Sequence, residues 1–217
     1  MSTVDVRPMP AASLARVLIE GPAGKIETDV NDPGGARRGI ALIAHPNPVQ
    51  GGTKDNKVVT TLAKAFFALG YVSARPNFRG VGASEGVHDE GRGETDDLLA
   101  VLDYARARFH AQAPVLAGFS FGAYVQTLVA RRVAPARMAL VGVAAGFVSG
   151  ERSYTAEPVP ADSIIIHGEL DATVPLANVL AWARPQELPV VVVPGADHFF
   201  HRRLHIIKYI IKGSWQR

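Results

Sequence analysis

The sequence predicts a single α/β domain built on a mostly parallel, twisted sheet of about eight strands, with helices on both faces. The first observation is a hairpin near the N-terminus, followed by strand-like runs that alternate with helix-like segments. The second is that these runs are apolar throughout, as in strands that are buried on both sides. The third is the length of 217 residues, which allows one domain to bury about 70% of its unfolded surface.

The elements follow one another in a regular order. Residues 1–12 are rich in proline and polar side chains, so we expect a flexible N-terminal tail before a single domain over residues 13–217. A Gly-Pro-Ala-Gly turn at residues 21–24 joins the two antiparallel strands of the hairpin, which we place at 15–20 and 25–30. The other strands are short apolar runs, predicted at 39–44, 71–74, 114–117, 138–143, 162–167 and 190–193. The helices have apolar residues three and four positions apart, and are predicted at 57–69, 95–109, 123–132, 176–183 and 200–211.

Polar residues follow directly on many of the predicted strands. In a sheet of this kind, ligands bind beyond the carboxyl ends of the strands, at one edge. Five strand ends carry polar or reactive side chains: His45-Pro46-Asn47, Asn77-Phe78-Arg79, Ser120, His167-Gly168-Glu169 and Gly195-Ala196-Asp197-His198. We therefore expect the functional site at this edge of the sheet.

The most informative motif is Gly-x-Ser-x-Gly at residues 118–122, between a predicted strand and a predicted helix. This is the context of a nucleophile elbow, a sharp turn that exposes a serine above the sheet. The serine, Ser120, would adopt a strained backbone conformation that costs about 1–3 kcal/mol. The glycines Gly118 and Gly122 would leave room where strand and helix nearly touch. Ser120 is thus the predicted nucleophile, and the alternative is an ordinary glycine-rich turn.

A serine hydroxyl becomes a good nucleophile when a histidine accepts its proton and a carboxylate orients that histidine. On this kind of sheet the three residues follow in the order Ser, Asp or Glu, His. Asp171 and His198 lie just after apolar strands and in this order, so they are the predicted acid and base. Glu169 and Asp197 are rival acids. Asp197 ranks second because it adjoins His198, and successive side chains usually point apart.

The other histidines have simpler interpretations. His45 could approach the site, but it is expected to shape the turn after its strand, because the base should come from the C-terminal part of the chain. His167 is expected to be buried and hydrogen-bonded. His201 and His205 lie four residues apart on the last predicted helix, which would allow a metal pair. No third ligand has supporting spacing, so we favour a solvated helix face and predict no metal site.

Acyl transfer also needs two hydrogen-bond donors for the negative oxygen of the tetrahedral intermediate. One should be the backbone N–H of Phe121, the residue after the nucleophile. The other should come from the loop after the third strand, where Pro46 and Pro48 have no N–H to donate. Asn47, between these prolines, is the predicted second donor. The alternative is that this segment merely ends the strand.

Composition excludes several classes of function. The chain has no cysteine, and hence no disulfide, zinc–thiolate site or cysteine nucleophile. Its 23 Lys and Arg residues, against 20 Asp and Glu, are scattered rather than clustered into the stripe that binds nucleic acid. The N-terminus has no apolar core of signal-peptide length, and no apolar stretch approaches the ~18 residues of a membrane span. We therefore expect a cytoplasmic protein that binds neither nucleic acid nor membranes.

Two glycine-rich segments do not match cofactor motifs. The segment from Gly80 has Glu85 at the sixth position, so it lacks the last glycine of Gly-x-Gly-x-x-Gly. The segment at residues 51–54 lacks the Gly-Lys-Ser/Thr of a phosphate-binding loop. No cofactor is expected. Acidic residues between 89 and 97 are interpreted as favourable charge near the start of a helix, with a cation site as the second choice.

Taken together, these motifs resemble the α/β-hydrolase superfamily over about residues 14–212. The motifs that carry the resemblance are His45-Pro46-Asn47-Pro48 with Gly51-Gly52, the segment Asn77–Gly86, the segment Gly118–Gly122, the segment His167–Pro175 and the segment Gly195–Phe199. The chain is most similar to small, lidless bacterial hydrolases of this superfamily. One departure is Pro46, which stands where the family usually has glycine. Similarity to dienelactone hydrolases is limited to the fold, because those enzymes use a cysteine.

The resemblance implies an α/β-hydrolase fold and the roles of five residues. Ser120, Asp171 and His198 would form the catalytic triad. The backbone N–H groups of Asn47 and Phe121 would form the oxyanion hole.

Chain length then limits the shape of the site. Of the 50 residues between Ser120 and Asp171, only about 146–160 remain as free loop, which is too short for a helical cap domain. We therefore expect an open pocket. Its expected substrate-binding residues are Phe119, Tyr124 and Phe147, with further walls from Phe121 and the loop 148–157.

The predicted function is that of a serine hydrolase that cleaves small carboxylic esters or thioesters through an acyl-serine intermediate. The expected partner is a small-molecule acyl substrate. One alternative is a small peptidase or amidase with the same triad, and another is a non-catalytic binding protein on the same fold. The apolar last helix also leaves a homodimer open.

Overall fold

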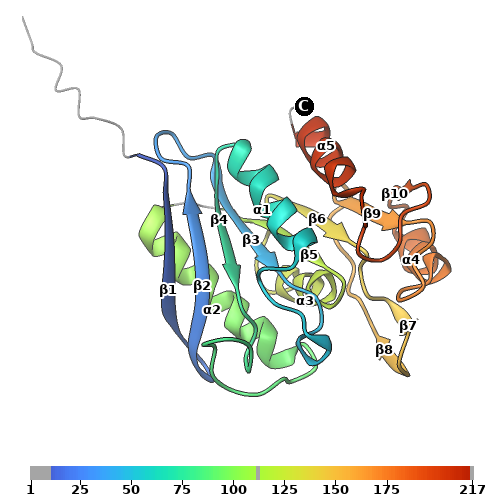
Figure 1. Ribbon diagram of the computed structural model, residues 1–217, viewed down its shortest axis with the longest axis horizontal. Coiled ribbons are helices and arrows are strands. Elements are labelled where there is room, and N and C mark those ends of the chain that lie inside the picture. Colours follow the sequence, from blue (N-terminus) through green and yellow to red (C-terminus); the bar gives the residue numbers. More distant parts are fainter. Residues whose placement is uncertain (1–10, 111–112, 216–217) are drawn as a thin grey trace, which may run out of the picture.

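The structure, a computed structural model, describes residues 11–110 and 113–215, and its central feature is an eight-stranded sheet (Figure 1). The strand order is β1-β2-β4-β3-β5-β6-β9-β10. The strands are β1 (Ser13–Gly21), β2 (Gly24–Asp32), β3 (Gly39–Ala44), β4 (Tyr71–Pro76), β5 (Val115–Phe119), β6 (Arg137–Val141), β9 (Ile164–Gly168) and β10 (Val190–Val193). Strand β2 pairs antiparallel with β1 and β4, and all other pairs in the sheet are parallel. The predicted mixed sheet with an antiparallel first hairpin is therefore confirmed.

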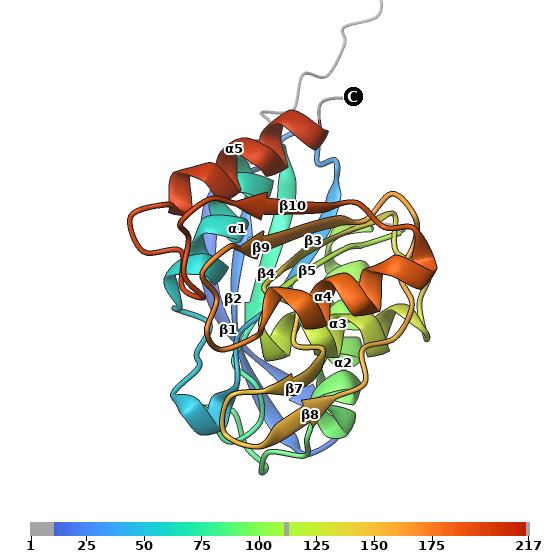
Figure 2. The ribbon, with the colours of Figure 1, turned by 90° about the vertical axis from the view of Figure 1, so that its right-hand side faces the viewer.

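Helices cover both faces of the sheet, as predicted (Figure 2). The helices are α1 (Lys57–Ala68), α2 (Arg92–Phe109), α3 (Phe121–Ala130), α4 (Leu176–Ala183) and α5 (Leu204–Trp215), with short 3-10 turns at Pro48–Gln50 and Arg184–Gln186. Successive strand residues point to opposite faces. In β3, Ile40 and Leu42 pack toward α2 and α3, while Ala41 and Ile43 pack toward α1 and α5. Two apolar cores result, one on each side of the sheet.

Some boundaries differ from the prediction for local reasons. Helix α2 begins at Arg92 rather than 95, because the Glu94 carboxylate accepts the N–H groups of Asp89 and Gly91 and thereby caps an earlier first turn. Helix α5 begins at Leu204 rather than 200, after a turn in which Phe200 and Arg202 have left-handed φ angles of 53° and 60°.

The segment expected to be free loop after β6 contains a small hairpin instead. Strands β7 (Gly146–Val148) and β8 (Arg152–Tyr154) form a separate antiparallel pair that stands apart from the main sheet (Figure 2). The turn between them has left-handed φ angles at Gly150 and Glu151. Each strand has only three residues, too few for an alternating pattern to be seen in the sequence. This region contains no helix, so the expectation of no cap domain holds.

An ionic cluster anchors the loop between β3 and α1 to the edge of the sheet. The Lys54 ammonium is buried, 3.1 Å from Asp29 Oδ2 and 3.3 Å from Asp55 Oδ2. The Arg75 guanidinium donates to the Lys54 carbonyl at 2.7 Å. A buried ammonium requires such partners, since an unpaired charge away from water is very costly. The cluster therefore gives this loop, which also contains Asn47, a fixed position.

Two expectations, the flexible N-terminal tail and the homodimer, are not tested by the structure. Residues 1–10 of the predicted tail lie outside the described residues, and Ala11 and Ala12 are exposed just before β1. Helix α5 buries Ile207, Ile211 and Trp215 in the core, and a homodimer remains a prediction. In the part of the chain that the structure describes, no helix is both long enough and apolar enough to traverse a bilayer.

Candidate active site

The serine of the Gly-x-Ser-x-Gly motif lies at a sharp turn between β5 and α3. Ser120 has φ 55° and ψ −120°, a strained conformation for a residue with a side chain. A Cβ on Gly118 would lie 2.6 Å from the Gly122 oxygen, and a Cβ on Gly122 would lie 2.4 Å from the His45 oxygen. Both glycines are thus required by close backbone approach. This is the geometry of a nucleophile elbow rather than of an ordinary turn.

Ser120, His198 and Asp171 form one hydrogen-bonded chain. His198 Nε2 lies 3.0 Å from Ser120 Oγ, and His198 Nδ1 lies 2.7 Å from Asp171 Oδ2. All three side chains are buried. Because the carboxylate can only accept, Nδ1 carries the proton and Nε2 is free to accept the serine proton. The sequence prediction places these three residues in this order, and the fold brings them together.

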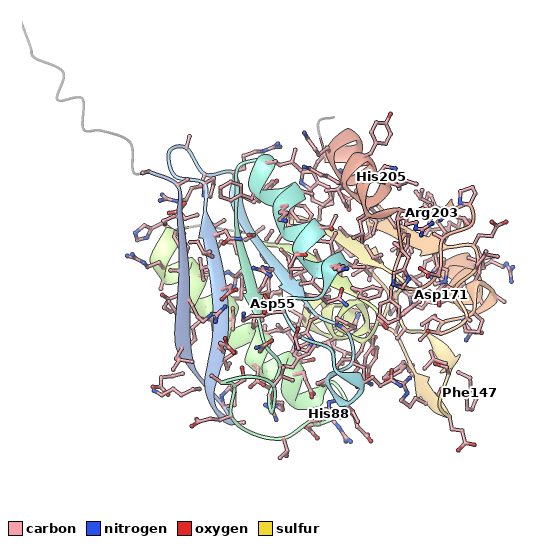
Figure 3. The ribbon with its side chains drawn as sticks, in the orientation of Figure 1. Asp55, His88, Phe147, Asp171, Arg203 and His205 are labelled. Atoms are coloured by element: carbon pink, nitrogen blue, oxygen red, sulfur yellow. The ribbon has the colours of Figure 1, made fainter. Side chains whose placement is uncertain are left out.

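Backbone groups hold Asp171 in place. Its Oδ1 accepts the N–H groups of Thr173 and Val174 at 2.9 and 2.8 Å, while Oδ2 faces His198. The carboxylate therefore cannot rotate without leaving buried donors unsatisfied. Figure 3 shows Asp171 in the loop beyond β9, close to the last part of the chain.

The two rival acids point elsewhere. The Glu169 carboxylate accepts the N–H of Gly195 at 2.7 Å. The Asp197 carboxylate contacts His201 Nδ1 at 2.5 Å and accepts the His201 N–H at 3.0 Å. Burial raises the pKa of Asp197, but the hydrogen bonds from His201 outweigh it and the net pKa is lowered. The expectation that Asp197 points away from His198 is therefore correct.

His45 and His167 are both buried and hydrogen-bonded, as predicted for His167. The His45 Nδ1–H donates to the Pro46 carbonyl at 2.6 Å, and its Nε2 accepts the Phe78 N–H at 2.9 Å. Burial lowers the pKa of His45 to about 4, so this ring is neutral at pH 7 and links the ends of β3 and β4. His167 donates from Nε2 to the Val174 carbonyl at 3.0 Å, and burial lowers its pKa despite the nearby Asp171.

The remaining ionisable residues that the structure describes form no metal centre. Within residues 11–110 and 113–215, no three or more His, Asp or Glu side chains are arranged to hold a metal ion. In the acidic segment before α2, Glu94 Oε1 accepts from His88 Nδ1 at 2.7 Å, and Asp97 binds the Arg79 guanidinium through both oxygens. These carboxylates stabilise the start of the helix and the turn after β4.

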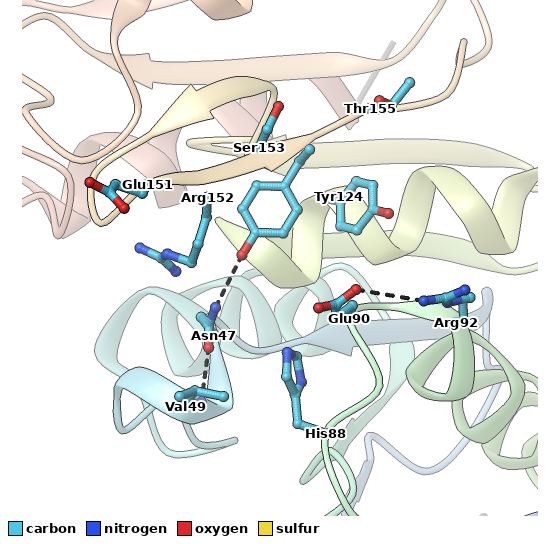
Figure 4. Close-up of a pocket in the computed structure, with 11 residues that line it drawn as sticks. Asn47, Val49, His88, Glu90, Arg92, Tyr124, Glu151, Arg152, Ser153 and Thr155 are labelled. Carbon is cyan, nitrogen blue, oxygen red and sulfur yellow. Dashed lines mark hydrogen bonds and ion pairs between the residues drawn. The ribbon is translucent and has the colours of Figure 1, made fainter.

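The loop after β3 is held rigidly around Asn47. Its Oδ1 accepts the Val49 N–H at 2.8 Å, and its carbonyl accepts the Gly52 N–H at 2.9 Å. Its Nδ2 donates to the Tyr154 hydroxyl at 3.1 Å. Figure 4 marks the contact between Asn47 and Val49 with a dashed line. Among the described residues, the backbone N–H groups of Asn47 and Phe121 have no protein acceptor. These two groups are available for a ligand.

The expected substrate-binding residues have different environments. The prediction that Phe119 lines the pocket is wrong, because this side chain is 0% exposed. Its ring packs against the His198 ring, with centroids 4.8 Å apart. Phe147 on β7 is 74% exposed and does not line the cavity beside Asn47 (Figure 3). Phe121 is also buried, beneath the cavity. Only Tyr124 lines it as predicted.

The cavity, of about 640 Å³, lies between the β7–β8 hairpin and the loop before α2 (Figure 4). Its lining residues are Asn47, Val49, His88, Glu90, Arg92, Tyr124, Glu151, Arg152, Ser153, Tyr154 and Thr155. The expected wall from the loop 148–157 is thus present in part. Tyr154 lies within that predicted loop but was not singled out from it, and His88 was not predicted as a lining residue, because neither belongs to a motif.

Comparisons with known proteins agree with this arrangement. A family model described as X-Pro dipeptidyl-peptidase (S15 family) matches residues 22–186. An uncharacterised protein of Rickettsia prowazekii is 32% identical over 196 residues, which span 86% of this chain and 82% of that protein. An α/β serine hydrolase homologue from Coxiella burnetii is 40% identical, with a TM-score of 0.81 and coverage of 93% of this chain and 97% of that chain. A lidless α/β serine hydrolase from Xanthomonas campestris is 34% identical, with a TM-score of 0.84 and 97% coverage of both chains.

The family match includes the elbow and Asp171, and the two solved structures extend the similarity over nearly the whole chain. The α/β-hydrolase resemblance of the sequence is thereby confirmed. The chain belongs to the S15 peptidase family, within the α/β serine hydrolases.

Proposed function

We propose that the protein cleaves small carboxylic esters or thioesters through an acyl intermediate on Ser120. The observation that carries the proposal is the hydrogen-bonded chain from Ser120 through His198 to Asp171. Such a chain activates a serine toward a carbonyl carbon. The open cavity beside Asn47, without a cap domain over it, suits a small substrate.

In the first half of the reaction, Ser120 Oγ attacks the carbonyl carbon while His198 Nε2 accepts the hydroxyl proton. The imidazolium that forms is stabilised by the Asp171 carboxylate at Nδ1. The carbonyl oxygen becomes negative and accepts the free N–H groups of Asn47 and Phe121. The tetrahedral intermediate then expels the alcohol or thiol, which takes the proton from His198.

In the second half, water replaces the leaving group. His198 Nε2 accepts a proton from the water as its oxygen attacks the acyl carbon. The intermediate collapses with release of the acid, and Ser120 Oγ recovers its proton from His198. Water is the only co-reactant in this sequence of steps.

A second candidate is a peptidase or amidase, which the description of the matching family favours. The same groups would act, but His198 would have to protonate a much poorer amine leaving group. A panel of p-nitrophenyl esters, acyl thioesters and aminoacyl-proline anilides distinguishes the two functions. Turnover of esters and thioesters without measurable cleavage of the anilides supports the esterase, whereas anilide cleavage that Ser120→Ala abolishes replaces it with the peptidase.

Labelling by a fluorophosphonate tests the nucleophile directly. We expect the wild-type protein to be labelled and the Ser120→Ala variant not to be. Replacement of His198 by alanine should abolish turnover, whereas the same change at the exposed His201 should leave most of it. Labelling of both proteins or of neither, or a greater loss at His201, contradicts the proposal. Absence of labelling would instead favour a binding protein on this fold.

A further inference from the structure

The cavity beside Asn47 has the size and position of a substrate subsite. Its volume of about 640 Å³ falls within the range of about 300–1,000 Å³ that is usual for small-molecule sites. Asn47, whose N–H is a proposed oxyanion donor, forms part of its wall. A substrate with its carbonyl oxygen at this N–H would therefore extend one of its two substituents into the cavity.

Aromatic rings form one side of the cavity. The rings of Tyr124 and Tyr154 have centroids 5.0 Å apart and are tilted by 49°. Beneath them lies the buried Phe121 ring, 5.9 Å from Tyr124 and 5.8 Å from Tyr154. The His88 ring also contacts Phe121, with centroids 5.3 Å apart. Tyr124 and Tyr154 are only half-buried, so each has ring surface left to contact a further group.

The charged groups around the cavity balance one another. The lining carboxylates are Glu90 and Glu151, and the lining guanidinium groups are Arg92 and Arg152. Glu90 and Arg92 form an ion pair at 3.6 Å (Figure 4). Arg152 donates from Nε and Nη2 to the carbonyl of Ser149, at 3.2 and 2.7 Å. Two negative and two positive groups leave no net formal charge, which favours a neutral ligand over an anion or a cation.

A hydrogen bond fixes the tyrosine wall to the reaction centre. The Tyr154 hydroxyl accepts from Asn47 Nδ2 at 3.1 Å, so the ring is held at a set distance from the proposed oxyanion hole. A side chain with this constraint loses little freedom when a ligand contacts it. The β7–β8 hairpin therefore presents a preorganised ring rather than a mobile one.

We propose that this cavity is a subsite for a neutral aromatic ring of the substrate, held by Tyr124 and Tyr154. The inference rests on the proposed function, because it assigns a substrate class to the same site. A ring placed 4.5–7 Å from the tyrosine centroids makes favourable aromatic contacts beyond those of an equally large saturated ring. Aromatic substrates should therefore exceed saturated ones by about threefold to tenfold in kcat/KM.

Matched pairs of esters test the subsite. Methyl 3-phenylpropanoate and methyl 3-cyclohexylpropanoate differ only in the ring on the acyl side, and benzyl acetate and cyclohexylmethyl acetate differ only on the alcohol side. We expect an aromatic-to-saturated ratio of about threefold to tenfold in one of the two pairs, and that pair identifies which substituent enters the cavity. Ratios near one in both pairs overturn the proposal.

Three variants show whether the tyrosines are the cause. Tyr124→Leu should reduce the ratio to near one, whereas Tyr209→Leu, at an exposed tyrosine on α5, should leave it unchanged. Tyr154→Phe keeps the ring and should keep the ratio, while kcat falls for both esters because the contact with Asn47 is lost. An unchanged ratio in Tyr124→Leu contradicts the proposal. If that variant does not fold, the wild-type ratios alone decide.

A labelling experiment separates this inference from the proposed function. The wild-type protein is treated with fluorophosphonates that carry a phenylpropyl or a cyclohexylpropyl group, and the rates of labelling at Ser120 are compared. Faster labelling by the phenyl compound supports the subsite, whether the natural reaction is on esters or amides. Equal rates refute the aromatic subsite alone, and no labelling by either compound refutes the proposed function.

Discussion

Replacing Asp171 by asparagine tests the hydrogen-bonded chain with the smallest possible change in shape. The Asp171 Oδ1 accepts two backbone N–H groups, from Thr173 and Val174. The asparagine oxygen must occupy that position, because an NH2 group there would face two donors. The NH2 group is then placed at the Oδ2 position, where it donates to His198 Nδ1. The His198 proton moves to Nε2, and the ring can no longer accept a proton from Ser120.

Two energetic losses determine how far kcat should fall in Asp171→Asn. A hydrogen bond to a charged group contributes about 1.5–3 kcal/mol, and the substitution removes the one that stabilises the His198 imidazolium. Restoring the active tautomer requires breaking the new contact and leaving a buried donor unsatisfied, which costs about 1–3 kcal/mol more. The sum is about 2.5–6 kcal/mol, which corresponds to a loss of about 10²–10⁴ in kcat. A loss of about 10⁴ is known for the same substitution in a serine protease of another fold.

The assay is steady-state hydrolysis of p-nitrophenyl acetate at pH 7.5. Asp197→Asn is the matched control, because Asp197 adjoins His198 in the chain but pairs with His201. We expect the control to retain most of its activity, and both variants to unfold at the wild-type urea concentration within error. Retention of more than about a tenth of kcat by Asp171→Asn would refute the tautomer argument. So would equal losses in the two variants.

Two further predictions concern stability. Gly122→Ala should destabilise the fold by about 1–3 kcal/mol in urea titration, because its Cβ would lie 2.4–2.5 Å from backbone atoms of β3 and its following loop. Gly213 lies in α5, where an added Cβ would meet no atom within 4 Å, so Gly213→Ala should stabilise the fold by up to about 1 kcal/mol. Equal changes in the free energy of unfolding for Gly122→Ala and Gly213→Ala would contradict the packing argument. His45 has a pKa of about 4 in the fold against 6.5 when exposed, so its contribution to stability is complete above pH 6.5 and is lost as the pH falls toward 4. About 2 kcal/mol should be lost between pH 7 and pH 5, and His45→Gln should reduce this pH dependence, whereas an unchanged slope would show that another group causes it.

The order of the elements and the hydrogen-bonded chain could be inferred from the sequence because both follow from local patterns. Helix α4 and strand β10 lie where their apolar spacing places them, at 176–183 and 190–193. The turn at Ser120 could be predicted from the sequence because close backbone contact requires glycine at positions 118 and 122. Asp171 and His198 could be predicted as partners of Ser120 because each follows a strand, and the carboxyl ends of parallel strands lie at one edge of the sheet.

The lining of the cavity beside Asn47 could be inferred only in part, through Tyr124 and the loop 148–157. Phe119 and Phe121 flank Ser120 in the sequence, but both rings point into the interior, one against His198 and one beneath Tyr124. Tyr154 comes from a hairpin whose three-residue strands leave no recognisable pattern. Its contact with Asn47 joins residues 107 positions apart.

The sequence by itself therefore determined the α/β-hydrolase fold and pointed to Ser120, Asp171 and His198, because turn chemistry and apolar periodicity depend on neighbouring residues. Only the tertiary structure decided which aromatic rings are accessible, and how Lys54 and Tyr154 hold the loop that contains Asn47. The physical reason is that burial and long-range contact depend on how distant segments pack. A phenylalanine beside Ser120 looks the same in the sequence whether it faces a ligand or the core.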